Sequence, residues 1–166
     1  NLQKYGFNGV NFVNGGKIVV RDCAIKENSF EGIKGYPTLE IQHDEKSSSR
    51  IQIKEEAFYN SQLSGNLEIN DFVSYIGTRA FAHCSFKDTN LFIDSVSIHD
   101  YAFAYSTGIK ELTLGEHVVT FDTDDDDENF HGFEGCDFTK LTLNLKGKIP
   151  NRAFYRLTSI ANDLTF

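Results

Sequence analysis

One two-residue signature, a small residue followed by phenylalanine, recurs along the whole chain. Its seven copies are Gly6-Phe7, Ser29-Phe30, Ala57-Phe58, Ala80-Phe81, Ala102-Phe103, Gly132-Phe133 and Ala153-Phe154. Each copy is followed by an apolar, a variable and an apolar residue: Ile18-Val19-Val20, Leu39-Glu40-Ile41, Leu67-Glu68-Ile69, Leu91-Phe92-Ile93, Leu112-Thr113-Leu114, Leu141-Thr142-Leu143 and Leu164-Thr165-Phe166. Such self-similarity is typical of a stack of small units, in which each unit contacts its neighbours, and not of a globule around one core.

The repeat has a period of about 24 residues, because successive triplets begin 21, 28, 24, 21, 29 and 23 residues apart. An apolar residue also stands five positions before most of the phenylalanines, at Ile25, Ile53, Ile76, Ile98 and Ile149. Before Phe133 this place is taken by Glu128. The longest steps coincide with polar insertions, so we expect one disturbed unit near Glu128.

The triplets have the pattern of half-buried β-strands. In Leu67-Glu68-Ile69, alternation with a period of two buries the outer residues and exposes the middle one. The phenylalanines are expected to be buried spacers at the opposite turn, where a small preceding residue lets the next coil pass closely. Pairs such as Val73 with Ile76 predict a second short extended segment in each coil. No long stretch has helical spacing of its apolar residues, so we expect few or no long helices.

The segment 73–84, VSYIGTRAFAHC, followed by Leu91-Phe92-Ile93, resembles the repeat of the BspA-like bacterial surface leucine-rich repeat family. That repeat reads roughly L-x-x-I-x-L-P-x-x-V-x-x-I-G-x-x-A-F-x-x-C, and the likeness extends from about residue 5 to residue 166. The proline after the strand is absent throughout, and cysteine holds its usual place only at Cys84 and Cys136. The resemblance implies a mainly β, right-handed solenoid with a parallel concave sheet of about seven short strands.

Composition narrows the class of partner. A net charge of −8 argues against nucleic acid and anionic membranes, because phosphate groups are bound by clustered lysine and arginine. No apolar run approaches the roughly 20 residues that span a bilayer, so membrane insertion is not expected. We expect residues 1–166 to form a single solenoid domain that is a segment of a longer surface protein, since no capping repeat follows the last strand.

The three cysteines are expected to be core residues that behave as small hydrophobic groups. Cys84 and Cys136 hold the same position in coils that are two steps apart. At about 4.8 Å per stacked strand, they would be separated by roughly 9 to 10 Å. A disulfide tolerates at most about 7 Å between Cα atoms, so this pair is not expected to be bridged.

The acidic run 122–128 is the most unusual local feature. Its alternating carboxylates have the oxygen-ligand spacing of calcium loops: Asp122, Asp124, Asp126 and Glu128. However, Asp127 stands where an EF-hand loop has its glycine, and Phe133 stands where it has its bidentate glutamate. We therefore interpret the run as a solvated insertion, and local calcium binding is the alternative.

No arrangement of residues indicates catalysis or a cofactor. The five histidines occupy different phases of the repeat and form none of the usual zinc spacings. Motifs for a nucleophilic serine or for phosphate binding are also absent. Nothing selects one pair from the 24 acidic residues as a catalytic pair. We therefore predict that the chain is not an enzyme and needs no cofactor or metal.

The exposed middle residues of the seven triplets form a row across the strands. With six separations of about 4.8 Å between neighbouring strands, this row is roughly 29 Å long. Together with flanking residues, they give the predicted ligand-binding set: Glu40, Glu68, Asn70, Asn90, Phe92, Asp94, Thr113 and Thr142. Phe92 is the one large aromatic residue in the central row, and exposed aromatic residues are frequent anchors at interfaces. The alternative is that Phe92 packs under a neighbouring insertion.

The resemblance implies a noncatalytic recognition or adhesion module of a secreted or cell-surface bacterial protein. Its expected partner is a host or matrix protein, another cell-surface protein or a glycan. Self-association is a further expectation, because the terminal repeat has an uncovered sheet edge. The alternative is a structural spacer, or a repeat segment attached to an enzyme, with no ligand of its own.

Overall fold

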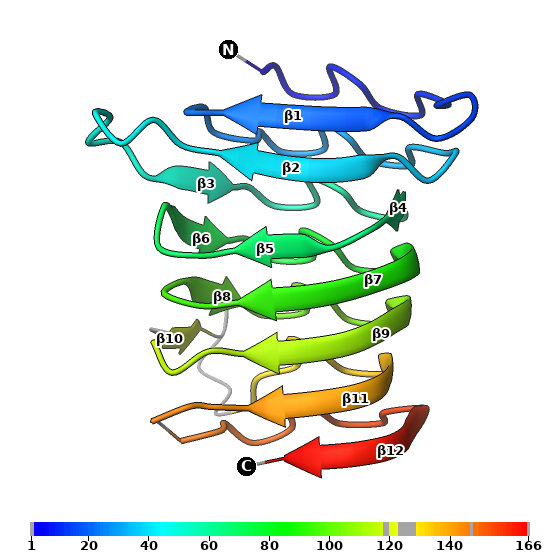
Figure 1. The fold of residues 1–166 in the computed structure, drawn as a ribbon, viewed down its shortest axis with the longest axis vertical. Helices are drawn as coiled ribbons and strands as arrows, with labels where there is room; N and C mark the ends of the chain where they lie inside the picture. The colour runs from blue at the N-terminus through cyan, green and yellow to red at the C-terminus, as the bar shows by residue number, and fades with distance from the viewer. Residues whose placement is uncertain (1, 118–119, 123–128, 147, 166) are drawn as a thin grey trace.

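The computed structural model describes residues 2–117, 120–122, 129–146 and 148–165. These residues form strands and turns and contain no helix. The strands stack in sequence order along one long axis, so that the two ends of the chain lie at opposite ends of the stack (Figure 1). The predicted mainly β solenoid is thus confirmed.

The larger sheet contains the first six triplets and, of the seventh, Leu164 and Thr165; Phe166 lies outside the described residues. Among the described residues it has eight strands, all paired in parallel, in the order β1-β2-β4-β7-β9-β11-β12, with β5 paired to β7. The strands are β1 (Lys17–Arg21), β2 (Thr38–Gln42), β4 (Gln62–Ser64), β5 (Leu67–Ile69), β7 (Ser85–Ile93), β9 (Thr107–Leu114), β11 (Asp137–Leu143) and β12 (Ser159–Thr165).

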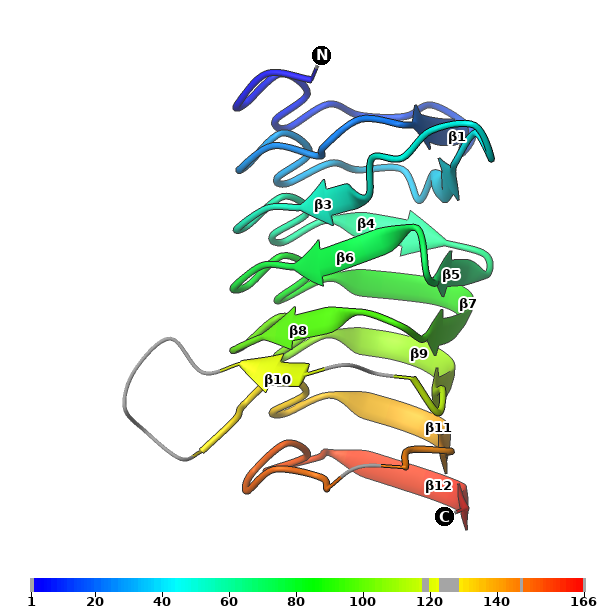
Figure 2. The same cartoon turned by 90° about the vertical axis from the view of Figure 1, so that its left-hand side faces the viewer.

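A smaller parallel sheet lies on the other side of the stack (Figure 2). In the described residues it has the order β10-β8-β6-β3. Its strands are β3 (Ile51–Ile53), β6 (Val73–Ile76), β8 (Ser97–His99) and β10 (Thr120–Asp122). The predicted second extended segment is confirmed. Three residues of its strands, Ile53, Ile76 and Ile98, have fully buried side chains.

Several strands of the larger sheet begin well before their triplets. β7, for example, starts at Ser85, six residues before Leu91. A buried apolar residue lies five or six positions after the phenylalanine of the coil in the extensions of β7, β9 and β11 and in the short strand β4: Phe86, Ile109, Phe138 and Leu63. This recurring position anchors the extension against the core, and it is a sequence signal that the triplet pattern alone does not capture.

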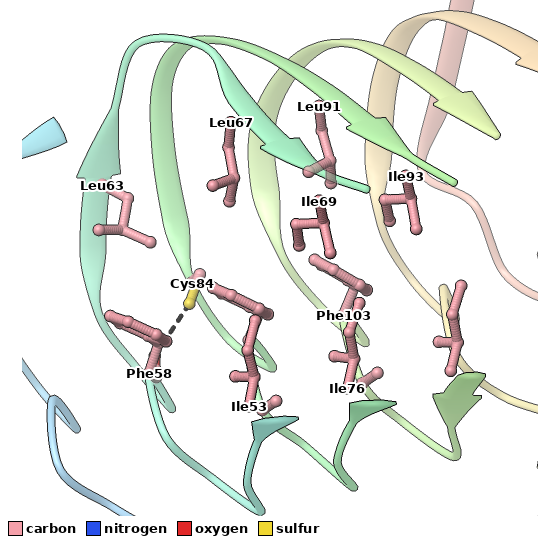
Figure 3. Close-up of a cluster of buried hydrophobic side chains, with 14 of the residues drawn as sticks. Ile53, Phe58, Leu63, Leu67, Ile69, Ile76, Cys84, Leu91, Ile93 and Phe103 are labelled. Atoms are coloured by element: carbon pink, nitrogen blue, oxygen red, sulfur yellow. Dashed lines mark hydrogen bonds between the residues drawn. The ribbon is translucent and has the colours of Figure 1, made fainter. Parts of the chain in front are cut away.

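The repeated phenylalanines form one continuous stack through the core. Neighbouring ring centroids from Phe7 to Phe154 lie 5.0 to 5.3 Å apart, with planes within 13° of parallel. This spacing follows the separation of about 4.8 Å between stacked strands. Figure 3 shows Phe58 and Phe103 pointing inward together with Leu63, Ile69 and Ile76. The prediction of buried spacers is confirmed in the interior coils, whereas it is wrong for Phe7, which is 43% exposed because it stacks on Phe30 through one face only.

The small residue before each phenylalanine lies where two coils come closest. The Phe58 N–H donates to the Ala80 carbonyl at 2.7 Å, and the Phe81 N–H donates to the Ala102 carbonyl at 2.7 Å. Both alanines are fully buried. The chain turns through left-handed residues on each side of the phenylalanine; Arg79 and His83, for example, both have φ of 56°. The predicted close passage at this turn is therefore confirmed.

A serine or cysteine, whose small side chain donates a hydrogen bond, lies three positions after most of these phenylalanines. Cys84 Sγ lies 3.0 Å from the Phe58 carbonyl oxygen in the adjacent coil (Figure 3), and Ser106 Oγ donates to the Phe81 carbonyl at 2.6 Å. The same contact is made by Ser61 to Phe30 and by Cys136 to Phe103. All three cysteines are free, and Cys84 and Cys136 are buried as predicted, whereas Cys23 is half-buried.

Candidate ligand-binding face

The middle residues of the triplets form the expected row on the outer face of the larger sheet. The strand register places Phe92 beside Glu68 on one side and Thr113 on the other, and Thr142 lies beside Thr113. The flanking apolar residues of these triplets are buried. The alternation of the strands therefore brings the predicted residues into line across β5, β7, β9 and β11.

Phe92 lies in the middle of this row with 37% of its surface exposed. It therefore faces solvent and does not pack under an insertion. On one side of it, Asn90 donates from Nδ2 to Asn66 Oδ1 at 3.1 Å, which links β7 to the neighbouring coil. On the other side, Asp94 accepts a hydrogen bond from the His117 backbone N–H at 2.7 Å. Asp94 thus holds the turn after β9, while Phe92 remains free to contact a ligand.

The larger sheet has one break in its pairing. β1 and β2 are paired over five residues, whereas β2 continues to the next coil only through Thr38 and Ser64. β5 pairs with β7 but not with β2, although β2 and β5 lie side by side (Figure 1). In the part of the chain that the structure describes, this is the only place where two successive triplets are not paired as strands.

A groove of about 460 Å³ occupies this break, and we call it the β2/β5 groove. It is lined by Lys17, Thr38, Leu39, Glu40, Ile41, Asn66, Glu68, Asn70 and Phe72. Glu40, Glu68 and Asn70, three of the predicted residues, meet here, and the other five lie elsewhere on the face. Phe72 was not predicted, because it follows the triplet at a position that carries no repeat signal. Its ring stacks on His43 with centroids 5.8 Å apart.

Charge is distributed unevenly along the β2/β5 groove. Lys17 forms an ion pair with Glu40, and Gln42 donates a further hydrogen bond to the same carboxylate. These two hydrogen bonds, that from Lys17 first, lower the pKa of Glu40 below its ordinary value. Glu68 has no ion pair or side-chain hydrogen bond with any described residue, and it is exposed. The groove therefore contains one neutralised and one unpaired carboxylate.

Asn70, one of the residues that line the groove, has an unsatisfied acceptor. Its Oδ1 atom is buried and has no hydrogen-bond partner among the described residues. Buried polar atoms are nearly always paired in folded proteins, so each exception needs an explanation. A ligand that donates a hydrogen bond in the groove would supply the missing partner after a small rotation of the amide.

A family model described as the BspA type leucine rich repeat region matches residues 23–160 in six copies. The chain belongs to this family. Comparison with curated proteins and with solved structures gave no match. The BspA-type repeat extends further than the matched range, because Phe7 continues the phenylalanine stack at 5.1 Å from Phe30. Residues 2–22 therefore add one more coil to the repeat.

The described part of this BspA-type solenoid contains no group of three or more histidine, cysteine or acidic side chains placed to hold a metal ion. The calcium candidates Asp124, Asp126 and Glu128 lie outside the described residues, as does the side chain of Asp122. None of the described elements is a helix that could cross a membrane. The exposed sheet face with its groove is therefore the strongest candidate site in the described residues.

Proposed function

We propose that the chain is a noncatalytic recognition module of a secreted or cell-surface bacterial protein, and that it binds through the exposed face of its larger sheet. Membership of the BspA-type leucine-rich repeat family supports a repeat module for protein interaction. Its partner in adhesion is a host or matrix protein, another cell-surface protein or a glycan. The charge of −8 disfavours nucleic acid as a partner.

The exposure of Phe92 is the observation that carries this proposal. A large aromatic side chain with polar neighbours on an exposed face has the character of an interface anchor, which contributes binding energy when a partner excludes water from it. The surrounding Glu68, Asn90 and Thr113 supply hydrogen-bonding groups of the kind found at an interface rim. A spacer without a ligand would gain nothing from this arrangement.

A second contact of the proposal is the terminal repeat edge, through which two copies would associate. In the described residues β12 pairs with β11 through one of its edges. A free strand edge favours pairing with another chain. The oligomeric state of the chain as a function of concentration tests this part of the proposal.

The test of the binding face is a screen of the purified chain against immobilised matrix proteins and oligosaccharides, repeated with Phe92→Ala. Tyr155→Ala is the matched control, because Tyr155 is 43% exposed but belongs to the phenylalanine turn of the last coil. We expect Phe92→Ala to lose most of the binding and Tyr155→Ala to keep it. Equal binding by both variants would show that the partner is not bound through Phe92, and binding to none of the surfaces would favour the spacer interpretation.

A further inference from the structure

We propose that the β2/β5 groove binds a neutral sugar residue of a glycan. This inference rests on the proposed function, because it assigns a ligand class to one part of the binding face. It starts from the break in the sheet, which is a property of this chain's backbone and not of the repeat pattern.

The backbone groups along the break need partners. In every other pair of successive triplets, N–H and C=O groups form the ladder of a parallel sheet, for example from the Asp94 N–H to the Ile69 carbonyl at 2.8 Å. Between β2 and β5 this ladder is missing beyond Thr38. Peptide groups that lose their ladder bonds are satisfied by water or by a ligand that both donates and accepts hydrogen bonds.

The width of the break selects the kind of ligand. Cα atoms of β2 and β5 still approach within 8 Å of one another. A peptide strand inserted between them would require about 9.6 Å, twice the usual strand separation of about 4.8 Å. The break is thus too narrow for an added strand. Hydroxyl groups fit better, because one oxygen atom both donates and accepts.

The side chains of the groove match a ring that carries several hydroxyl groups. Hydrogen-bond donors and acceptors are offered by Thr38, Asn66 and Asn70. The carboxylate of Glu68 is a strong acceptor, and no described residue donates a hydrogen bond to it. The buried Asn70 Oδ1 requires a donor. Phe72 supplies an apolar wall at the same site. The volume of about 460 Å³ lies within the roughly 300 to 1,000 Å³ of small-molecule sites.

The charge of the groove selects neutral over acidic sugars. Lys17 is its only cationic lining residue, and its charge is balanced by Glu40. The unpaired Glu68 leaves an excess of negative charge, which would repel a sialic acid or a uronic acid. Neutral hexoses and N-acetylated hexoses carry hydroxyl and amide groups without this penalty.

The experiment uses the intact chain on an array of immobilised oligosaccharides that end in galactose, N-acetylglucosamine, sialic acid or a uronic acid, with immobilised proteins on the same surface. Glu68→Gln removes the charge at the groove. Glu111→Gln is the matched control, because Glu111 lies on the same face in β9 and pairs with Lys140, outside the groove. We expect neutral sugars to be bound, with at least about tenfold weaker binding after Glu68→Gln and little change after Glu111→Gln.

Three results would overturn the sugar assignment while leaving the proposed function intact: binding to immobilised proteins but to no sugar, preference for acidic sugars, or equal effects of the two substitutions. If no surface retains the chain, the proposed function fails together with the inference. Both glutamates are solvent-accessible, so thermal unfolding of the variants is expected to match the wild type.

Discussion

The ring of Phe58 stacks on the ring of Phe81 in the next coil, with centroids 5.0 Å apart and planes 3° from parallel. Phe81 stacks in the same way on Phe103. Each face of an interior phenylalanine ring therefore packs against the phenylalanine ring of a neighbouring coil. As a result, each coil depends on two neighbours for the burial of this side chain. This arrangement makes the fold a one-dimensional stack.

We predict that Phe81→Ala lowers the free energy of unfolding by about 3 to 5 kcal/mol, because it leaves a cavity and uncovers two neighbouring rings. The measurement is urea unfolding followed by circular dichroism, since the chain has no tryptophan. Phe92→Ala is the control; its ring is partly exposed, and it is expected to cost about 1 kcal/mol or less. Similar losses for both variants would contradict the stacked core.

A second prediction concerns the buried thiols. Burial raises the pKa of Cys84, and likewise that of Cys136, from 9.0 to about 12. Because the folded state favours the neutral thiols, their contribution to stability is fully present below about pH 9 and is lost as the pH rises from 9 towards 12. At pH 8, we expect iodoacetamide to modify the half-buried Cys23 first.

Mass spectrometry of peptides after timed labelling measures the three thiols separately. In urea all three are expected to react, which shows that the reagent reaches each of them once the chain unfolds. Equal rates for Cys23, Cys84 and Cys136 in the folded chain would show that the thiols are not buried in the core.

Arg50 links coils that are distant in the sequence. Its Nε donates to the Asp71 carbonyl at 2.8 Å, and its Nη2 donates to the Ser95 carbonyl at 3.0 Å. Lysine lacks the planar fork needed for both contacts, so Arg50→Lys is expected to destabilise the fold by about 1 kcal/mol. Arg79→Lys is the control, because Arg79 makes a long, exposed ion pair with Glu56 at 3.8 Å and lies over the Tyr101 ring, and a lysine can make both kinds of contact. Thermal unfolding compares the two; equal midpoints would mean that Arg50 does not clamp the coils.

Much of the fold could be predicted because each coil repeats the same pattern of buried and exposed residues. The triplet alternation identified the strand faces, and the Ala-Phe signature identified the tightest turn, as the Phe58 N–H bond to the Ala80 carbonyl shows. The extra length of β7 was missed, because residues 87–90 are polar and the alternation is lost there. The exposure of Phe7 follows from its place in an end coil, which the local pattern does not encode.

The binding row could be predicted for the same reason, since the register of a parallel stack aligns Glu68, Phe92 and Thr113. The β2/β5 groove could not. It depends on two strands that pack together without pairing, beside Gly65 at φ of 73° and next to the polar insertion that follows β2. Such a break depends on backbone geometry across coils, which the sequence of either coil does not specify.

The most direct test of the binding face measures how a bound partner protects one position on it. In a Cys23→Ser background, Asn90→Cys places a thiol on the face beside Phe92, which stays in place. Tyr155→Cys places a thiol on the phenylalanine turn, while the two native thiols that remain are buried. Each chain is labelled with a fluorescent maleimide, with and without the protein or glycan found in the screen. We predict that the partner slows labelling at position 90 and leaves labelling at position 155 unchanged. Protection at position 155 alone would contradict recognition through the larger sheet.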